Sequence, residues 1–304
     1  MRVNGIVGLV AAVFLGGTAL TAAAPISVML LDGESAGTYH DWKAVTPVLK
    51  KELEETGLFR VDVVTAPPSS SGDLAAFHPD FSKYQVVVLN YDAPDWPVAL
   101  KTAFEAYMKN GGGLVSVHAA DNAFAGWKAF NEMIGIGGWR NRNEAAGPLW
   151  FLRDGKLVSD KSPGNAGAHG ARLPFAVTAR EPQHPILKGL PAVWMHQGDE
   201  LYSTLRGPGE NMHVIATAFS DPANKGTGRD EPILITLDYG KGRVFHTTLG
   251  HDISALSCVG FAATFQRGTE WAATGKVTQK VPEGFPTATT VSYRPDIVAM
   301  GVGK

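Results

Sequence analysis

Short apolar runs alternate with amphipathic stretches along the first half of the chain. Strand-length apolar runs occupy residues 26–31, 59–64, 85–89 and 113–117. Between them, apolar residues recur at helical spacing from Val45 to Leu53 and from Leu100 to Met108. Strands that are apolar on both faces and alternate with amphipathic helices are typical of a parallel sheet covered by helices on both sides. The pattern therefore predicts an α/β fold.

The second half of the chain has a different rhythm. From Gly135 to about Leu201 the helical periodicity is weak, and glycine, tryptophan and arginine cluster at residues 137–140. We interpret this part as an irregular insertion across one end of the sheet. Strand patterns return at residues 173–178, 212–218, 232–237 and 243–248, and a final helix is predicted over about 255–273. The proline-containing segment 277–304 is predicted to be an extended C-terminal tail, which leaves one domain over residues 24–276.

The N-terminal segment has the features of a signal peptide. Arg2 precedes an almost wholly apolar run over residues 6–20, and the small residues 21–24 offer a cleavage site. The alternative is a membrane anchor, but the run is shorter than the ~20 residues that a spanning helix needs. We therefore expect residues 1–23 to be removed during export to the periplasm or the cell exterior. No later stretch is long and apolar enough to span a membrane, so the mature chain is not expected to be an integral membrane protein.

Composition and charge exclude several classes of function. The 304 residues include 27 basic and 29 acidic side chains and no basic run, which argues against nucleic acid as a partner. One cysteine, Cys258, permits no intramolecular disulfide and no multi-cysteine metal site. It lies in an apolar run, which favours a buried structural thiol over a nucleophile.

Three histidines follow three separate predicted strands. His40 lies in the loop after the first strand, His118 directly follows the strand over 113–117, and His251 follows the strand over 243–248. Ligands of parallel sheets bind beyond the carboxyl ends of the strands, so these side chains are predicted to line one crevice. Alternatively, each is a structural histidine. Because neutral imidazole is the commonest metal ligand, the three are also candidate ligands of a divalent metal ion.

Further candidates for this crevice come from other loops. The carboxylates of Asp199 and Glu200 follow the insertion, Asp121 lies close behind His118, and His169 lies in a glycine-rich loop. Trp42 could present a flat face to a sugar. The alternatives are a solvated turn for the acidic pair and a core position for the tryptophan. The chain has no Gly-x-Ser-x-Gly sequence, so a serine hydrolase has no support.

Five segments, in order, resemble one known family. They are residues 33–42 ending in Tyr-His-Asp-Trp, residues 111–118, His-Pro-Ile-Leu-Lys-Gly-Leu at 184–190, Asp-Glu-Leu-Tyr at 199–202, and residues 239–251. Together they resemble the ThuA-like (trehalose utilisation) proteins over about residues 26–273. The resemblance implies a flavodoxin-like three-layer sandwich of the class I glutamine amidotransferase-like superfamily. That superfamily carries a cysteine on the turn after a central strand, where this chain has His118 and no cysteine. Glutamine amidotransferase activity is therefore not expected.

The resemblance also implies a role in the use of trehalose or related disaccharides, alongside a glucoside 3-dehydrogenase that forms 3-keto sugars. A ketone at C3 acidifies the C2 proton, so a base could start elimination of the glycosidic substituent. We predict a sugar-processing lyase or hydrolase in which His118 or Glu200 is the base, and another histidine such as His251, or a metal ion, polarises the carbonyl. The residues predicted to bind the substrate are His40, Trp42, Asp121, Asp199 and His169. The competing hypothesis is a non-catalytic carbohydrate-binding protein. A structural or partner-binding role has no positive support.

Overall fold

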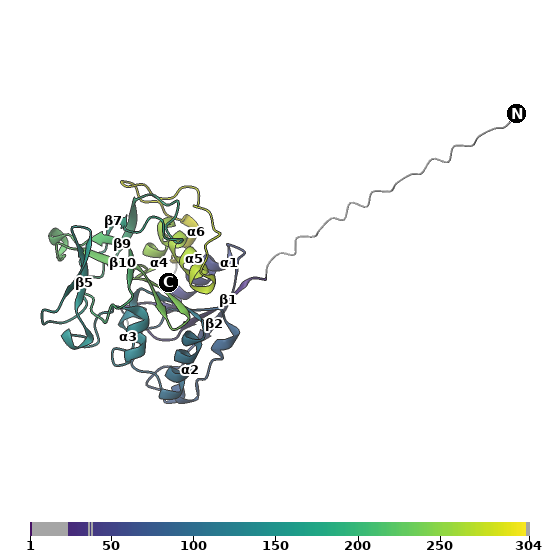
Figure 1. Cartoon of the computed structure of the whole chain (residues 1–304), viewed down its shortest axis with the longest axis horizontal. Helices are drawn as coiled ribbons and strands as arrows, with labels where there is room; N and C mark the ends of the chain where they lie inside the picture. The colour runs from purple at the N-terminus through teal and green to yellow at the C-terminus, as the bar shows by residue number, and fades with distance from the viewer. Residues whose placement is uncertain (2–23, 36, 38, 302–304) are drawn as a thin grey trace.

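The computed structural model describes residues 1, 24–35, 37 and 39–301, and its described strands form one mixed sheet flanked by helices (Figure 1). The strands are β1 (Ile26–Asp32), β2 (Phe59–Thr65), β3 (Val86–Leu89), β4 (Gly113–Val117), β5 (Leu149–Arg153), β6 (Lys156–Asp160), β7 (Leu173–Ala179), β8 (Val193–Asp199), β9 (His213–Phe219), β10 (Asp230–Tyr239) and β11 (Gly242–Thr247). The α-helices are α1 (Trp42–Glu54), α2 (Val98–Lys109), α3 (Lys128–Ile134), α4 (Ile253–Leu256), α5 (Val259–Thr274) and α6 (Pro295–Gly301). Short 3₁₀ helices are η1 (Asp73–Ala76), η2 (Phe81–Lys83), η3 (His118–Asn122), η4 (Glu144–Ala146) and η5 (Pro222–Asn224).

The core of the sheet has the predicted flavodoxin-like arrangement. Its strands run parallel in the order β2-β1-β3-β4-β11. Successive side chains of β1 enter opposite layers, since Met29 and Leu31 pack with the residues of α2 and α3, whereas Val28 and Leu30 pack with those of α1 and α5. Figure 1 shows α2 and α3 on the other side of the core strands from α1 and α5. The predicted α/β three-layer fold is confirmed, and the carboxyl ends of its parallel strands meet at one edge.

The segment predicted as an irregular insertion contains more β-structure than expected, because only the strand over 173–178 was predicted within it. It contains the β5–β6 hairpin, β7 and β8, and the sheet continues antiparallel from β11 through β10, β9 and β7 to β8. The sheet is therefore parallel only in its core rather than through most of its width. The apolar pattern missed β8 because its later half is His-Gln-Gly-Asp, which pairs through its main chain.

The C-terminal region also differs from its prediction. The helix expected over 255–273 is divided into α4 and α5 by an extended backbone at Cys258, which pairs with Tyr293 from the tail. The tail is extended only as far as Arg294 and then forms α6, which Pro295 begins and Ile297 anchors in the core. These contacts explain why a proline-rich segment ends in a docked helix.

The predicted signal peptide over residues 1–23 lies outside the described residues, apart from Met1. Within the part of the chain that the structure describes, no helix combines the length and apolar character needed to cross a membrane.

Candidate active site

The turn after β4 places His118 at the carboxyl edge of the sheet. Its backbone is left-handed, with φ of 46°, a region that costs a non-glycine residue roughly 1–2 kcal/mol. The ring is almost fully buried, and its Nδ1–H donates to the carbonyl oxygen of Thr248 at 2.7 Å. Because a carbonyl can only accept, this bond leaves the lone pair on Nε2.

Three imidazole rings from three strand ends lie together at this edge. His40 comes from the loop after β1 and His251 from the loop after β11. The ring centroid of His40 lies 5.1 Å from that of His118 and 5.0 Å from that of His251. The ring centroids of His118 and His251 are 5.4 Å apart. The convergence expected from strand-end positions is therefore present in the fold.

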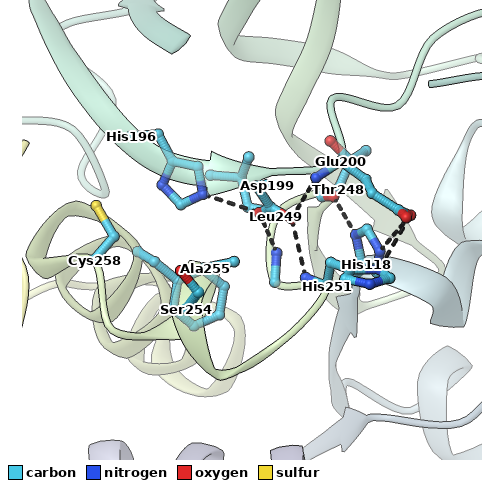
Figure 2. Close-up of polar contacts among 12 residues, drawn as sticks. His118, His196, Asp199, Glu200, Thr248, Leu249, His251, Ser254, Ala255 and Cys258 are labelled. Atoms are coloured by element: carbon cyan, nitrogen blue, oxygen red, sulfur yellow. Dashed lines mark hydrogen bonds and ion pairs between the residues drawn. The ribbon is translucent and has the colours of Figure 1, made fainter. Parts of the chain in front are cut away.

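Glu200 brings a carboxylate into this histidine group. Its Oε2 lies 3.1 Å from Nδ1 of His251 and 3.7 Å from Nε2 of His118 (Figure 2). Burial would raise the pKa of Glu200, but the nearby imidazoles of His118 and His251 outweigh burial and lower the pKa strongly. Burial would likewise lower the pKa of His118, but Glu200 and Asp199 outweigh it and raise the pKa. Burial, with the neighbouring His118 and His251, lowers the pKa of His40 to about 3. The group thus combines an ionised carboxylate with a neutral His40.

The same four side chains, His40, His118, Glu200 and His251, can hold a metal ion. One ligand atom from each lies within 4.8 Å of all the others. In a tetrahedral site with bonds of about 2.1 Å the ligand atoms lie roughly 3.4 Å apart, so side-chain shifts of about an ångström would close the site. His40 Nδ1, His118 Nε2 and His251 Nδ1 are buried and lack a hydrogen-bond partner among the residues that the structure describes. Three such nitrogens beside a carboxylate suit Zn²⁺ or another transition metal better than Mg²⁺ or Ca²⁺.

A network of hydrogen bonds centred on Asp199 fixes the loops that carry Glu200 and His251. Asp199 Oδ1 accepts the main-chain N–H groups of Glu200 (2.8 Å) and His251 (3.1 Å). Its Oδ2 accepts Gly250 N–H (2.8 Å) and His196 Nε2–H (2.9 Å). Figure 2 shows His196 between Asp199 and Cys258. Burial would lower the pKa of His196, but Cys258 and Asp199 raise it to about 10. Asp199 therefore acts on the site through its neighbours.

A cavity of about 530 Å³ opens beside the cluster. Its lining residues are Tyr39, His40, Asp92, Asn122, Trp139, Arg140, His169, Glu200 and Tyr202. This volume lies in the range of small-molecule sites, and the lining combines aromatic faces with polar groups that converge on one space. The arrangement suits a polar organic ligand of disaccharide size.

Comparison with known proteins identifies the family. The family model ThuA, described as trehalose utilisation, matches residues 27–272. The chain belongs to the ThuA family. It is 47% identical to a ThuA-like protein of Parabacteroides merdae ATCC 43184, with 90% of this chain and 99% of that chain covered and a TM-score of 0.86. A ThuA-like protein of Bacteroides uniformis ATCC 8492 shares the fold at 21% identity, with 86% and 97% covered and a TM-score of 0.57. The comparison with curated proteins gave no match.

In this ThuA family protein the turn after β4 carries His118, and that turn has no cysteine. The one cysteine of the chain, Cys258, is fully buried at the junction of α4 and α5. Burial would raise the pKa of the Cys258 thiol, but His196 outweighs it and lowers the pKa to about 7. The thiol lies outside the cavity, which agrees with the structural role expected from the sequence.

The eight predicted site residues of this ThuA family protein divide into two groups. The side chains that meet at the site are His40, His118, His169, Glu200 and His251. The other three lie elsewhere. Asp199 is buried beneath the loops that carry Glu200 and His251, where it accepts their main-chain N–H groups. Asp121 is fully buried with its Oδ2 3.2 Å from Nε2 of His246. Trp42 lies in the first turn of α1, outside the cavity, with Lys43 Nζ 5.5 Å from its ring centroid. The chemical roles of all eight stay predictions.

Six of the nine lining residues were not among the predicted site residues: Tyr39, Asp92, Asn122, Trp139, Arg140 and Tyr202. Asn122 follows Asp121 directly, and Tyr202 lies two positions after Glu200, so both adjoin residues that were selected. Trp139 and Arg140 lie in the glycine-rich cluster at residues 137–140, which stood out by its composition but showed no periodic pattern. Their placement depends on a turn that only the fold reveals.

Proposed function

We propose that this protein is an exported enzyme that processes trehalose or a related disaccharide oxidised at C3. A transition-metal ion held by His40, His118, His251 and Glu200 would assist the reaction. One observation carries the proposal: three buried imidazole nitrogens that lack hydrogen-bond partners among the described residues converge on one carboxylate beside a cavity of disaccharide size. The family description, trehalose utilisation, supports the class of substrate.

The ligand set defines what an ion could do here. A bound divalent ion would polarise the C3 carbonyl and stabilise negative charge on its oxygen. The three imidazole ligands are neutral and the one carboxylate cancels only part of the charge of a divalent ion. The loaded site would therefore keep a net positive charge, which stabilises the negative charge of an enolate. His118 is held in the required tautomer by the Thr248 carbonyl, and Asp199 fixes the main chain of Glu200 and His251. These contacts orient the ligands before substrate arrives.

With His118 and Glu200 occupied as ligands, His169 is the best-placed base. Its Nδ1–H donates to the Gly170 carbonyl oxygen at 2.8 Å, so the lone pair is on Nε2, which lies 3.6 Å from Glu200 Oε1. The side chain is 37% exposed and lines the cavity, so it can meet a substrate and release a proton to solvent. A partly exposed imidazole that lines the cavity suits proton abstraction next to a ketone.

The bond changes follow from that position. His169 Nε2 takes the proton from C2, and the C2–H electron pair forms an enolate with the C3 carbonyl. The enolate then re-forms the ketone with a C1–C2 double bond as the glycosidic C1–O bond breaks. The departing oxygen takes a proton, which releases one monosaccharide, and water can then add to the unsaturated keto sugar. A glucoside 3-dehydrogenase acting earlier would supply the ketone.

The test combines metal analysis with turnover. The purified chain is loaded with Zn²⁺, Mn²⁺, Co²⁺ or Fe²⁺, its metal content is measured, and monosaccharide release is followed from trehalose and from 3-keto-trehalose. We expect about one ion per chain and turnover of the keto sugar alone. Turnover should disappear after chelation, return with metal, and be absent in His118→Asn. Metal content far below one equivalent, or turnover that survives chelation, contradicts the metal. Saturable sugar binding without turnover supports a carbohydrate-binding protein instead.

Export belongs to the same proposal and rests on residues 1–23. We expect the full chain expressed in a Gram-negative host to appear, shortened at its N-terminus, in the periplasm or the medium. A chain starting at Ala24 should remain in the cytoplasm. Retention of an uncleaved full-length chain in the membrane fraction would instead indicate the anchor.

A further inference from the structure

The loop that carries the lining residues Trp139 and Arg140 contains an unusual backbone turn. Trp139, Arg140 and Asn141 are all left-handed, with φ values of 49°, 46° and 62°. Left-handed geometry is uncommon for any non-glycine residue, and three in succession require the surroundings to hold them. Residues with strained backbone geometry are more frequent at active sites and ligand-binding sites than elsewhere.

Main-chain hydrogen bonds and a buried arginine hold this turn. Trp139 N–H donates to the Ala166 carbonyl (3.1 Å), Arg142 N–H donates to the Trp139 carbonyl (2.8 Å), and Ala166 N–H donates to the Arg142 carbonyl (2.9 Å). The Arg142 guanidinium is 3% exposed and donates to the carbonyl oxygens of Gly138 (2.6 Å) and Asn122 (2.7 Å). The turn is therefore tied to η3, the element that begins with His118.

The turn presents an aromatic ring and a guanidinium to the cavity. The Trp139 ring lies against Tyr202, with centroids 4.5 Å apart, and both rings line the cavity. Arg140 Nε–H donates to Oδ1 of Asp92 at 2.6 Å, and the Asp92 side chain is 2% exposed. The other N–H groups of Arg140 make no hydrogen bond within the described part of the chain. The guanidinium is thus fixed through one edge while its remaining donors stay available.

We propose that Trp139, Arg140 and Asp92 form the subsite for the sugar ring that does not react, and that this subsite selects neutral disaccharides over phosphorylated ones. The inference rests on the proposed function and extends it to substrate selection. A guanidinium and a carboxylate held side by side offer donors and an acceptor to adjacent hydroxyl groups, and an aromatic face packs against the C–H face of a sugar. The Arg140 guanidinium is already paired with the Asp92 carboxylate, so the subsite itself has no unpaired cation that could bind a phosphate group.

Trehalose itself is the probe, because without a C3 ketone it should bind and remain intact. Calorimetric titration of the metal-loaded protein would compare trehalose with trehalose 6-phosphate, for wild type, Arg140→Met, Arg140→Lys and Asp92→Asn. The matched control is Arg172→Met, which removes an exposed arginine paired with Asp252 outside the cavity. We expect Arg140→Met to weaken trehalose binding about tenfold or more, and Arg140→Lys to restore little because lysine lacks the planar fork. The control should bind as wild type does, and the phosphorylated sugar should bind at least about tenfold more weakly.

Turnover of 3-keto-trehalose separates failure of the subsite from failure of the proposed function. For Arg140→Met we expect a raised KM with kcat nearly unchanged, since the subsite touches the ring that does not react. If wild type turns over but Arg140→Met and Asp92→Asn keep wild-type affinity and KM, the subsite is wrong and the proposed function stands. Tighter binding of the phosphorylated sugar overturns the selectivity. A wild-type protein that neither binds nor converts either sugar overturns both. Thermal melting of each variant identifies any that fail to fold.

Discussion

The main-chain N–H of His251 donates to Oδ1 of Asp199 at 3.1 Å, although the two residues are 52 positions apart. The same oxygen accepts Glu200 N–H, so one carboxylate holds both loops that deliver Glu200 and His251. In Asp199→Asn one of the two acceptor oxygens becomes an NH₂ group, so either the N–H groups of Glu200 and His251, or Gly250 N–H and His196, lose their acceptor. We expect metal affinity to fall about 10–100-fold, the range found for residues that orient metal ligands. Competition with a chromophoric chelator measures it.

A matched control for Asp199→Asn exists elsewhere in the core. Asp121 is also fully buried and also pairs with a buried histidine, His246, but it binds no ligand of the candidate metal site. Asp121→Asn should therefore keep metal affinity within about threefold even if the melting temperature falls. Equal losses of affinity in both variants would show that general destabilisation, and not the anchoring of the two loops, controls the site.

Metal affinity should rise with pH through the neutral range. The metal must displace any proton on His118 Nε2, and the pKa of His118 is raised because Glu200 and Asp199 outweigh burial. Protons therefore compete with the metal at higher pH than they would at an ordinary histidine. His40, with its pKa lowered to about 3, stays neutral throughout. Metal dissociation constants measured from pH 5.5 to 8.5 should fall as the pH rises, and a flat profile would contradict His118 as a ligand.

The sequence supported the fold more fully than the site, for physical reasons. The core strands β1, β3 and β4 are apolar on both faces, and such continuous apolar runs can be recognised as buried strands in the sequence. β8 could not be recognised in this way, because its side chains are mixed in polarity and its pairing depends on main-chain hydrogen bonds.

Within the site, histidines at strand ends were predictable, since the topology of a parallel sheet gathers those positions. The presence of Arg140 in the cavity lining could not be predicted, nor could the burial of Asp121 and Asp199. Arg140 reaches the cavity only through a left-handed turn held by Arg142, a contact between side chain and main chain that leaves no periodic trace. Asp121 and Asp199 turn inward to partners that are far away in the sequence, His246 for the first and Gly250 for the second.

A buried acid in α1 should make stability depend on pH. Glu52 is fully buried, and neither carboxylate oxygen has a hydrogen-bond partner in the described residues, so burial raises its pKa well above the usual value. The folded state therefore keeps the proton, while the unfolded state releases it above pH 4.5. Ionisation of the unfolded state costs stability as the pH rises. Glu52→Gln should raise the melting temperature at pH 7 by several degrees more than at pH 4.5.

Its control is Glu54→Gln, two positions along the same helix. Glu54 is exposed and pairs with Lys50 at the surface, so its removal should change stability by less than about 0.5 kcal/mol at either pH. A Glu52→Gln variant with the same melting temperature change at both pH values would indicate that the Glu52 carboxyl is ionised in the folded protein.

His169 provides the sharpest separation between holding a metal and moving a proton. It lines the cavity and lies 3.6 Å from Glu200 Oε1, but it is outside the group of four side chains whose ligand atoms converge. His169→Asn should therefore retain about one metal ion per chain and bind the keto sugar, while kcat falls by about 10²–10⁴, the range for loss of a general base. His118→Asn should lose metal and turnover together. If His169→Asn keeps full turnover, the base must be one of the cluster residues, and Glu200, which also lines the cavity, becomes the residue to test next.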